Sequence, residues 1–341
     1  MIRPAGVAVI GREACRSRAT DDRMAVDMKP ATAWGERREA LIIVNPVAHN
    51  APKKTRLQEA DDWLRAQGWK AEWRETRAAG EAGGMAAAAA AAGVPLVFVV
   101  GGDGTLREAV NGLVGTETAL AHVPAGMSSL WAREVGFKRR PVRAIEQAIA
   151  GERRKVDVGR AGEEYFLLMA GYGIDAAVVQ NVSLPLQGRV GTAAYALASA
   201  REALRYRGTH MRLRFDDEEV EGHVLMLVAG NTRLYAGITQ ITPEAVVDDG
   251  LLDVRVYMGR GRVDLIRFAL QTLFRRHRGS GRVIYRRVRE LHMDWETPLP
   301  VQLDGDPCID SPNHVKVVPG SLWVAVPAGL KSPLFSARAD Q

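Results

Sequence analysis

One stretch of the sequence decides the fold: Val97-Phe98-Val99-Val100-Gly101-Gly102-Asp103-Gly104-Thr105-Leu106-Arg107-Glu108. A short apolar run ends in three glycines, one acid and one hydroxyl, and apolar residues then recur at helical spacing. The stretch therefore predicts a buried strand, a tight loop and a helix. Glycines let backbone N–H groups approach an anion closely, and the start of a helix adds a positive dipole. This combination favours a phosphate-binding loop, although Gly-Gly-Asp-Gly is also ordinary turn chemistry between any strand and helix.

Asp103 distinguishes this loop from a site for phosphate alone. The loop matches neither G-x-x-x-x-G-K-[ST] nor G-x-G-x-x-G followed by an acid about 20 residues later. A carboxylate is unfavourable beside a phosphate, but it suits a metal ion or a substrate hydroxyl. We therefore expect Asp103 to hold one of these two groups next to the bound phosphate.

Strands alternate with helices over the first half of the chain. The predicted elements are strands at 40–44, 69–74, 95–100 and 119–124, and helices at 53–67, 86–92, after the Gly-rich loop and at 130–135. This order predicts a doubly wound parallel sheet, in which loops at the carboxyl ends of the strands line one crevice. Asn45, Thr76, Asp103 and the loop at Gly126 all lie at such ends.

After about residue 155 the pattern changes to short strands with little helix between them. The strand candidates are 165–170, 210–215, 222–229, 250–257, 283–285, 290–293, 315–318 and 321–326, and the helix candidates are 191–207 and 263–276. Such a series predicts an all-β second domain. At the other end, residues 1–36 are interpreted as a poorly ordered extension, within which Met24 or Met28 is an alternative start.

Composition limits the function classes. The chain has 341 residues and a net charge of +6, which is compatible with phosphorylated ligands or an anionic membrane surface. Aromatic residues make up only 6%, and they are not interleaved with a basic stripe, so we expect no nucleic-acid partner. Cys15 and Cys308 form neither a metal motif nor a disulfide framework. Without a long apolar run or a signal-peptide pattern, a cytoplasmic protein is expected.

Six motifs occur in a fixed order: Asn45-Pro46, Gly101–Thr105, Pro124-Ala125-Gly126, Gly171-Tyr172-Gly173-Ile174-Asp175, Pro243–Val254 and Asp304-Gly305-Asp306-Pro307. In this order and spacing the chain resembles the diacylglycerol kinase catalytic-domain family, which includes bacterial lipid kinases and sphingosine kinases. Gly-Gly-Asp-Gly-Thr alone is shared with NAD kinases, so a relative of those enzymes is a weaker alternative. The Asp-Asp-Gly-x-Leu-Asp and Asp-Gly-acid-Pro motifs are more specific to the lipid kinases.

The resemblance implies an N-terminal α/β nucleotide domain and a C-terminal β-sandwich, with ATP and lipid meeting between them. It implies an α/β domain over 37–155, completed by a final strand near 318–327. A β-sandwich that binds lipid then covers 156–317, and a tail follows over 328–341.

The family motifs also imply site residues. They place ATP against Asn45, Thr76, Gly101, Gly102, Asp103, Gly104, Thr105, Leu106, Arg107, Gly126 and Met127. They place a structural Mg²⁺ on Asp249 and on the backbone carbonyls of Val246 and Leu251; from the residues alone this segment is a β-turn. Asp306 matches a glutamate proposed as general base, with Asp103 holding a second metal or sharing that role. From the residues alone, Asp304 to Pro307 is a hairpin turn.

Two loops depart from the family pattern. After the fourth strand the family has Gly-Thr-x-Asn, whereas this chain has Met127 and Ser129 at the threonine and asparagine positions. A methionine cannot donate to phosphate, and each lost hydrogen bond to a charged group costs on the order of 1.5–3 kcal/mol. The first loop lacks the usual Ser-Gly, and His49 and Asn50 offer other polar groups. The alternative function is therefore a catalytically weak or inactive member that binds lipid or nucleotide.

A basic segment at 260–289 is the candidate for membrane contact. Its arginines flank a helix with a broad apolar face, which suits an anionic bilayer; a core-packed helix with a solvated basic rim fits equally well. A second apolar patch at Val182–Leu186 is expected near a lipid entrance. From this segment we expect peripheral contact with an anionic membrane surface; the sequence does not define the lipid, and a homodimer stays open.

Overall fold

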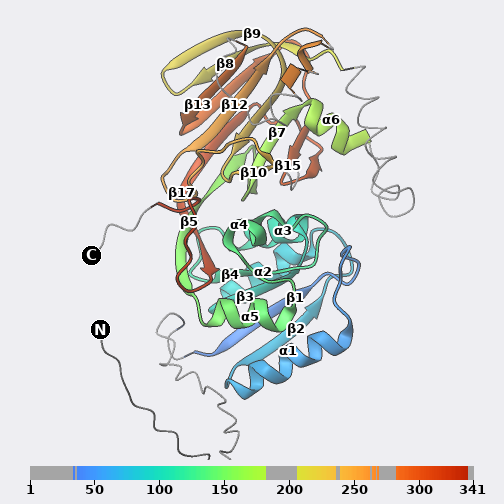
Figure 1. Cartoon of the computed structure of the whole chain (residues 1–341), viewed down its shortest axis with the longest axis vertical. Coiled ribbons are helices and arrows are strands. Elements are labelled where there is room, and N and C mark those ends of the chain that lie inside the picture. The colour runs from blue at the N-terminus through green and yellow to red at the C-terminus, as the bar shows by residue number, and fades with distance from the viewer. Residues whose placement is uncertain are drawn as a thin grey trace, which may run out of the picture. The chain divides into compact units, whose positions relative to one another are not determined.

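The computed structural model describes residue 34 and residues 37–181, 206–235, 239–261, 263–265, 267–268 and 282–336. Figure 1 shows the elements of the first half, which are β1 (Glu39–Val44), α1 (Lys54–Ala66), β2 (Lys70–Glu75), α2 (Glu81–Ala91), β3 (Leu96–Gly101), α3 (Asp103–Leu113), β4 (Ala119–Pro124), α4 (Leu130–Val135) and α5 (Pro141–Ile149). Those of the second half are β5 (Glu152–Ala161), β6 (Glu164–Phe166), β7 (Met169–Gly173), α6 (Ile174–Asn181), β8 (Thr209–Phe215), β9 (Glu218–Gly230), β10 (Leu234–Tyr235), β11 (Thr239–Gln240), β12 (Leu252–Met258), β13 (Val283–Val288), β14 (Glu290–Trp295), β15 (Val301–Leu303), β16 (Asp306–Cys308) and β17 (His314–Val326).

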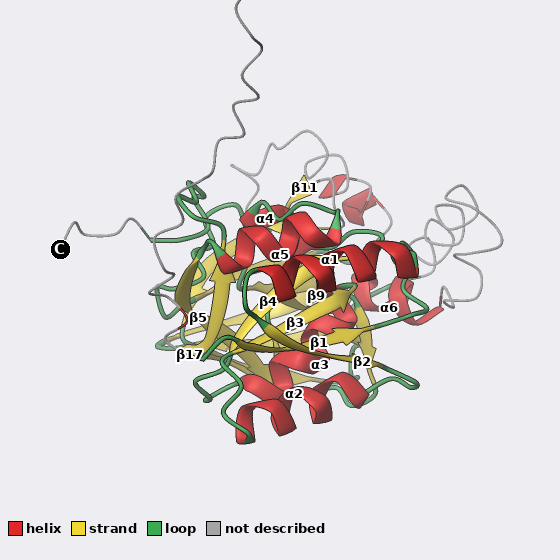
Figure 2. Cartoon of the chain, turned by 90° about the horizontal axis from the view of Figure 1, so that it is seen from below, coloured by secondary structure: helices red, strands yellow, loops and turns green. Residues whose placement is uncertain are grey.

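The first half contains a parallel sheet with the strand order β2-β1-β3-β4-β17. β3 and β4 are buried throughout, as their continuous apolar sequences require, whereas β2 at the edge is largely exposed. Helices α1 and α5 cover one face and α2 and α3 the other (Figure 2). α2 and α3 cross closely, since a Cβ on Gly112 would lie 2.2 Å from the carbonyl oxygen of Gly83. The predicted doubly wound sheet is confirmed.

The second half is the predicted β-sandwich. Along β8, inward apolar residues alternate with outward charged residues, as expected for a sheet with one buried face. β9 serves two layers, because its first half pairs with β8 and its second half pairs with β7 and β12. The core between the layers includes Phe166, Tyr172, Leu213, Leu227 and Val254.

Two long strands join the halves. β5 runs antiparallel to β17, and β17 also pairs in parallel with β4 through Trp323 and Val324. Separate strands were predicted at 315–318 and 321–326, but the structure has one strand whose register shifts between Val318 and Leu322. Pro319 lies in this shift and lacks the N–H group that a regular ladder needs. Both strands run through boundaries that were predicted near residues 155 and 317.

Some predictions lie largely outside the described residues: the helices at 191–207 and 263–276, the patch at Val182–Leu186 and the extension at 1–36. Within that extension Trp34 is buried and its indole N–H donates to the carbonyl of Ile149 at 3.0 Å. In the predicted tail, Leu334 and Phe335 are also buried. Within the described part of the chain, the helices are too short or too polar to cross a membrane.

Candidate active site

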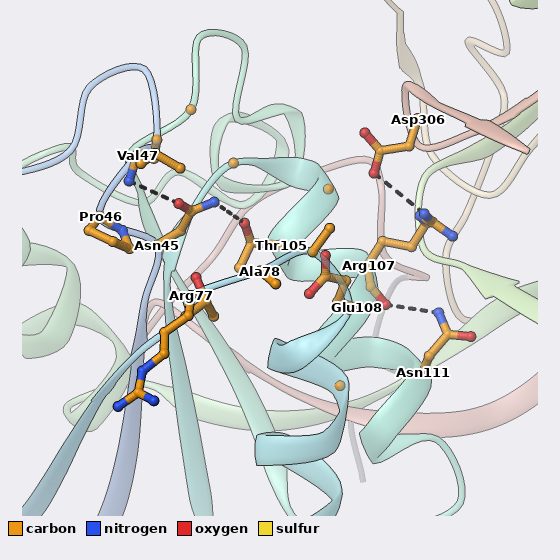
Figure 3. Close-up of a pocket in the computed structure, with 18 of the residues that line it drawn as sticks. Asn45, Pro46, Val47, Arg77, Ala78, Thr105, Arg107, Glu108, Asn111 and Asp306 are labelled. Carbon is orange, nitrogen blue, oxygen red and sulfur yellow. Dashed lines mark hydrogen bonds and ion pairs between the residues drawn. The ribbon is translucent and has the colours of Figure 1, made fainter. Parts of the chain in front are cut away.

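A cavity of about 1340 Å³ opens at the carboxyl ends of the parallel strands (Figure 3). The loops after β1, β2, β3 and β4 line one side of it, together with α3. Glu164, Asp306 and Pro307 come from the second half of the chain. The cavity thus occupies the crevice that the doubly wound order predicts.

The structure brings most of the predicted ligand-binding residues into this lining: Asn45, Thr76, Gly102, Gly104, Thr105, Arg107, Gly126 and Asp306. Four others lie elsewhere. Leu106 is buried in the core on the sheet side of α3, and the Gly101 carbonyl accepts the N–H groups of Ala125 and Gly126. Asp103 and Met127 are also absent from the described lining, and Met127 is 54% exposed. Helical periodicity explains Leu106, because consecutive helical residues face different directions.

The Gly-rich loop presents backbone N–H groups at the start of α3. Within the described chain no side chain caps this helix, whose N-cap is Gly102. The Asn45 amide donates to the Thr105 hydroxyl at 2.9 Å, and the Asn45 side-chain oxygen accepts the N–H of Val47 at 3.1 Å. A Cβ on Gly126 would lie only 2.6 Å from the Cα of Gly102, so the loops after β3 and β4 touch backbone to backbone. An uncapped helix start with two glycine loops is a favourable environment for an anion.

Asp103 makes a different contact from the predicted one. Its carboxylate accepts the backbone N–H of Leu130 at 2.9 Å and that of Trp131 at 3.4 Å, and thus caps α4. Ser129, at the N-cap position, has a left-handed backbone with a φ of 44°, and its own side chain does not cap the helix. Its hydroxyl instead accepts the N–H of Gly126 at 3.2 Å. Asp103 therefore supplies the cap that the local residue does not.

Asp306 reaches the Gly-rich loop from the hairpin of β15 and β16. The two turn residues, Asp304 and Gly305, have φ values of 52° and 93°, as a tight two-residue hairpin requires. The Asp304 carboxylate accepts three backbone N–H groups from Leu167, Leu168 and Met169 at 2.8–2.9 Å, which fixes the hairpin. A Cβ on Gly104 would lie 2.5 Å from an Asp306 oxygen, so any larger residue there would displace this carboxylate from its position. The segment is both the predicted turn and part of the cavity.

Arg107 links the two halves of the cavity through its charge. One guanidinium nitrogen lies 3.4 Å from the Asp306 carboxylate (Figure 3). Another forms an ion pair with Glu164. Burial raises the pKa of Asp306, and the positive charge of Arg107 opposes that rise. Asp306 is thus a stronger base than a fully solvated aspartate, with a cation at hand.

Two polar residues near the cavity, Asn111 and Glu108, were not predicted as contacts, whereas Asn50 was expected to offer a polar group in the first loop. The Asn111 side chain bonds both backbone groups of Tyr165, at 2.9 and 3.0 Å, and so attaches α3 to β6. Glu108 accepts the N–H of Ala82 at 3.2 Å, and Asn50 donates to the carbonyl of Gly126 at 2.9 Å. The spacing of four residues from Arg107 to Asn111, which places both on one helical face, is the signal that could have indicated Asn111.

The predicted metal ligands Val246, Asp249 and Leu251 lie on the turn before β12, apart from the described cavity lining. One Asp249 oxygen accepts the N–H of Leu251 at 3.0 Å, and the other forms an ion pair with Arg287. The turn itself is held by Asp157, whose carboxylate accepts the N–H groups of Gly250 and Gly320. Its carboxylate and carbonyl oxygens are the hard donors that Mg²⁺ prefers, but the Arg287 guanidinium already neutralises Asp249. The residues fit a divalent cation if Arg287 turns away.

Comparisons with known proteins agree with this arrangement. A model described as the diacylglycerol kinase catalytic domain matches residues 39–161, and one described as the YegS C-terminal NAD kinase beta sandwich-like domain matches residues 169–326. A probable lipid kinase YegS-like protein of Chromohalobacter salexigens is 30% identical over 295 residues, which cover 85% of this chain and 94% of the relative. The chain therefore belongs to the lipid kinase family that contains the YegS-like proteins and the bacterial diacylglycerol kinases.

Further relatives agree with the family. The diacylglycerol kinase of Bacillus subtilis is 26% identical over 272 residues, which cover 79% of this chain and 90% of that protein. A solved diacylglycerol kinase structure from Bacillus anthracis has a TM-score of 0.68 at 21% identity, and the match covers 87% of this chain and 99% of that one. This structural comparison shows that the two proteins share a fold. The predicted family and fold class are confirmed.

Proposed function

We propose that this lipid kinase family member transfers the γ-phosphate of ATP to a hydroxyl group of a lipid. One observation carries the proposal: the Asp306 carboxylate lies directly against Gly104 of the uncapped Gly-rich loop, and both residues line the cavity. Phosphoryl transfer needs a held nucleotide, a positioned hydroxyl and an acceptor for its proton, with little covalent work from the protein. The loop at Gly104 would hold the phosphates of the nucleotide, and Asp306 would accept the proton of the hydroxyl.

The nucleotide would bind with its phosphates at the start of α3. The backbone N–H groups of Gly104 and Thr105 face that position, and Asn45 fixes the Thr105 side chain through its 2.9 Å hydrogen bond. Thr76 and Gly126 border the same space. Arg107 contributes a positive charge close to the transferred group, where negative charge develops on the phosphoryl oxygens.

Asp306 would accept the proton of the lipid hydroxyl while the hydroxyl oxygen attacks the γ-phosphorus. A bond forms between this oxygen and phosphorus, the bond from phosphorus to the β-phosphate oxygen breaks, and ADP leaves. The raised pKa of Asp306 suits this role, because a general base works best when its pKa approaches the working pH. Arg107 keeps the carboxylate ionised before the transfer.

The turn at Asp249 would hold Mg²⁺ through its carboxylate and the carbonyls of Val246 and Leu251. When bound, the ion neutralises negative charge at this turn and fixes its oxygens. The Asp157 carboxylate holds the turn in place because it accepts the N–H groups of Gly250 and Gly320. The nucleotide itself would enter as its magnesium complex, as is usual for kinases.

The acceptor would be diacylglycerol, a sphingoid base or a related lipid, because each offers a hydroxyl beside apolar chains. The chain would reach it at an anionic membrane surface, where its net charge of +6 is favourable. A family member that keeps the fold but transfers no phosphate is the second candidate. The exposure of Met127 favours it, since this residue replaces a hydroxyl donor of the family loop.

Incubation of the purified chain with γ-labelled ATP and a panel of lipids in vesicles tests the proposal. We expect a labelled phospholipid, and we expect its loss in the Asp306→Asn variant. A related active kinase serves as positive control, and NAD in the panel tests the NAD kinase alternative. Absence of any labelled lipid while the control is active would overturn the proposal, and calorimetry with ATP would then show whether nucleotide binding remains.

A further inference from the structure

Two histidines and a glutamate gather on the outer face of the second-half sheet. Glu290 and His292 lie on β14, and His314 begins β17. His292 and His314 are direct partners in the antiparallel pairing, and Glu290 lies two residues before His292 and thus on the same face. None of the three lines the described cavity, and none has a role in the proposed phosphoryl transfer.

The spacing of these side chains fits one shared ion. A single Glu290 oxygen lies 3.3 Å from Nε2 of His314 and 3.9 Å from Nε2 of His292. One ligand atom from each residue lies within 4.8 Å of the others. Ligands at the usual zinc distances sit about 3.4 Å apart around a tetrahedral ion, so small movements complete the geometry.

The two imidazole rings are free to make that movement. They stack with centroids 4.0 Å apart and planes 5° from parallel. The His292 and His314 side chains are 41% and 35% exposed. Rotation of each ring about its side-chain bonds therefore turns both Nε2 atoms toward one point without repacking the core.

The charges around the cluster are mixed. Lys316 on β17 is the register partner of Glu290, and Arg214 on β8 is the register partner of His292. The Arg214 guanidinium lies 3.5 Å from the Asp294 carboxylate. Glu290 thus supplies the one carboxylate among the three proposed ligands.

We propose that Glu290, His292 and His314 form a surface site for a divalent transition-metal ion such as Zn²⁺. Two imidazoles and one carboxylate suit a borderline ion, whereas Mg²⁺ prefers oxygen ligands alone. Three protein ligands leave a position for water. The ion would cross-link β14 to β17, the strand that continues into the first sheet.

Titration of the full chain with ZnCl₂ by calorimetry, and with CoCl₂ by visible absorption, tests this site. We expect one ion bound through these residues and a loss of affinity of about tenfold or more in His292→Gln and in His314→Gln. The matched control is His210→Gln, which removes another histidine from the same face, beside Glu221 and Glu296. This control should keep the wild-type affinity.

Thermal unfolding gives a second readout that does not depend on catalysis. Zn²⁺ should raise the melting temperature of the wild type and of His210→Gln, but not that of the His292→Gln/His314→Gln double variant. The double variant without metal should melt close to the wild type, because both side chains are exposed. Equal zinc affinity and equal stabilisation in the double variant and the wild type, or no binding to the wild type, would overturn the proposal.

Discussion

The carboxylate of Asp103 accepts the backbone N–H of Leu130 at 2.9 Å, so the Gly-rich loop caps the helix that follows the next strand. The loops after β3 and β4 thus form one unit, which the contact between Gly102 and Gly126 also holds. In the folded chain Asp103 does not line the described cavity, but it holds the two loops that do. Its substitution should therefore affect stability as well as activity.

Asp103→Ala should lower the free energy of unfolding by about 0.5–2 kcal/mol, because both N–H groups at the start of α4 lose their acceptor. Asp103→Asn keeps one acceptor oxygen and should cost less. Urea unfolding of both variants measures this difference. If Asp103→Asn loses all kinase activity at unchanged stability, the carboxylate acts on the nucleotide or its metal, as the sequence predicts, and the cap is secondary.

Asp306→Asn should lower kcat by about 10²–10⁴-fold while ATP affinity stays near the wild-type value, because the amide cannot accept the hydroxyl proton. Asp306→Glu should retain part of the activity, since the carboxylate returns on a longer side chain. The exposed Asp310→Asn is the control. Initial rates and calorimetry with ATP separate the two effects, and equal rates for Asp306→Asn and the control would contradict the role of a base.

Met127→Thr combined with Ser129→Asn should tighten ATP binding by about tenfold or more, because the pair restores a hydroxyl and an amide to the loop. Asparagine also tolerates the left-handed backbone at position 129 better than serine does, so stability should rise slightly. Calorimetry measures both single variants and the pair. Unchanged affinity in the pair would show that this loop does not contact the nucleotide.

The pH dependence of stability should report Asp253. Burial raises the pKa of this carboxyl to about 6, although it accepts a hydrogen bond from Tyr285. The folded state therefore holds this proton at a pH where the unfolded chain has released it, and stability falls as pH rises from about 4 to 6.

Asp253→Asn should remove that part of the pH dependence, which is at most about 3 kcal/mol. Urea unfolding across this range, for the variant and the wild type, isolates the contribution of Asp253. The exposed Asp310→Asn is the control for removing a carboxylate at the surface. A wild-type slope that persists in Asp253→Asn would contradict the assignment.

Arg287→Ala should increase the stabilisation of the chain by MgCl₂, because Asp249 loses the guanidinium that now competes for its carboxylate. Asp249→Ala should abolish that stabilisation. Melting temperatures with and without MgCl₂ measure the effect, and Arg289→Ala is a nearby control. Equal magnesium responses in Arg287→Ala and Asp249→Ala would exclude a metal at this turn.

Much of the fold was predictable because its signals are local. The apolar runs of β1, β3 and β4 and the glycines after β3 predicted the parallel sheet directly. β5 was missed, since its first four residues, Glu152 to Lys155, are charged and its pairing with β17 is nonlocal. β17 was predicted as two strands because Pro319, which cannot donate to a regular ladder, interrupts its local pattern.

The order of the motifs predicted which residues belong to the candidate site, but it did not predict the directions in which their side chains point. The order of the motifs predicted that Asn45, Thr105 and Asp306 share one site, and all three line the cavity in the structure. It could not indicate that Asp103 turns toward α4 or that Leu106 faces the core. The spacing from Arg107 could have placed Asn111 on the same face of α3, but its hydrogen bonds to Tyr165 depend on the contact between α3 and β6, which no local pattern contains.

The pairing of β17 with β4 has a consequence for protein synthesis. Trp323 and Val324, which complete the first sheet beside β4, are translated about 200 residues after it. Until then the nascent chain carries β4 as an open sheet edge, which is prone to intermolecular pairing. The N-terminal half therefore cannot finish folding as it is made, and a chain cut short before Trp323 should aggregate.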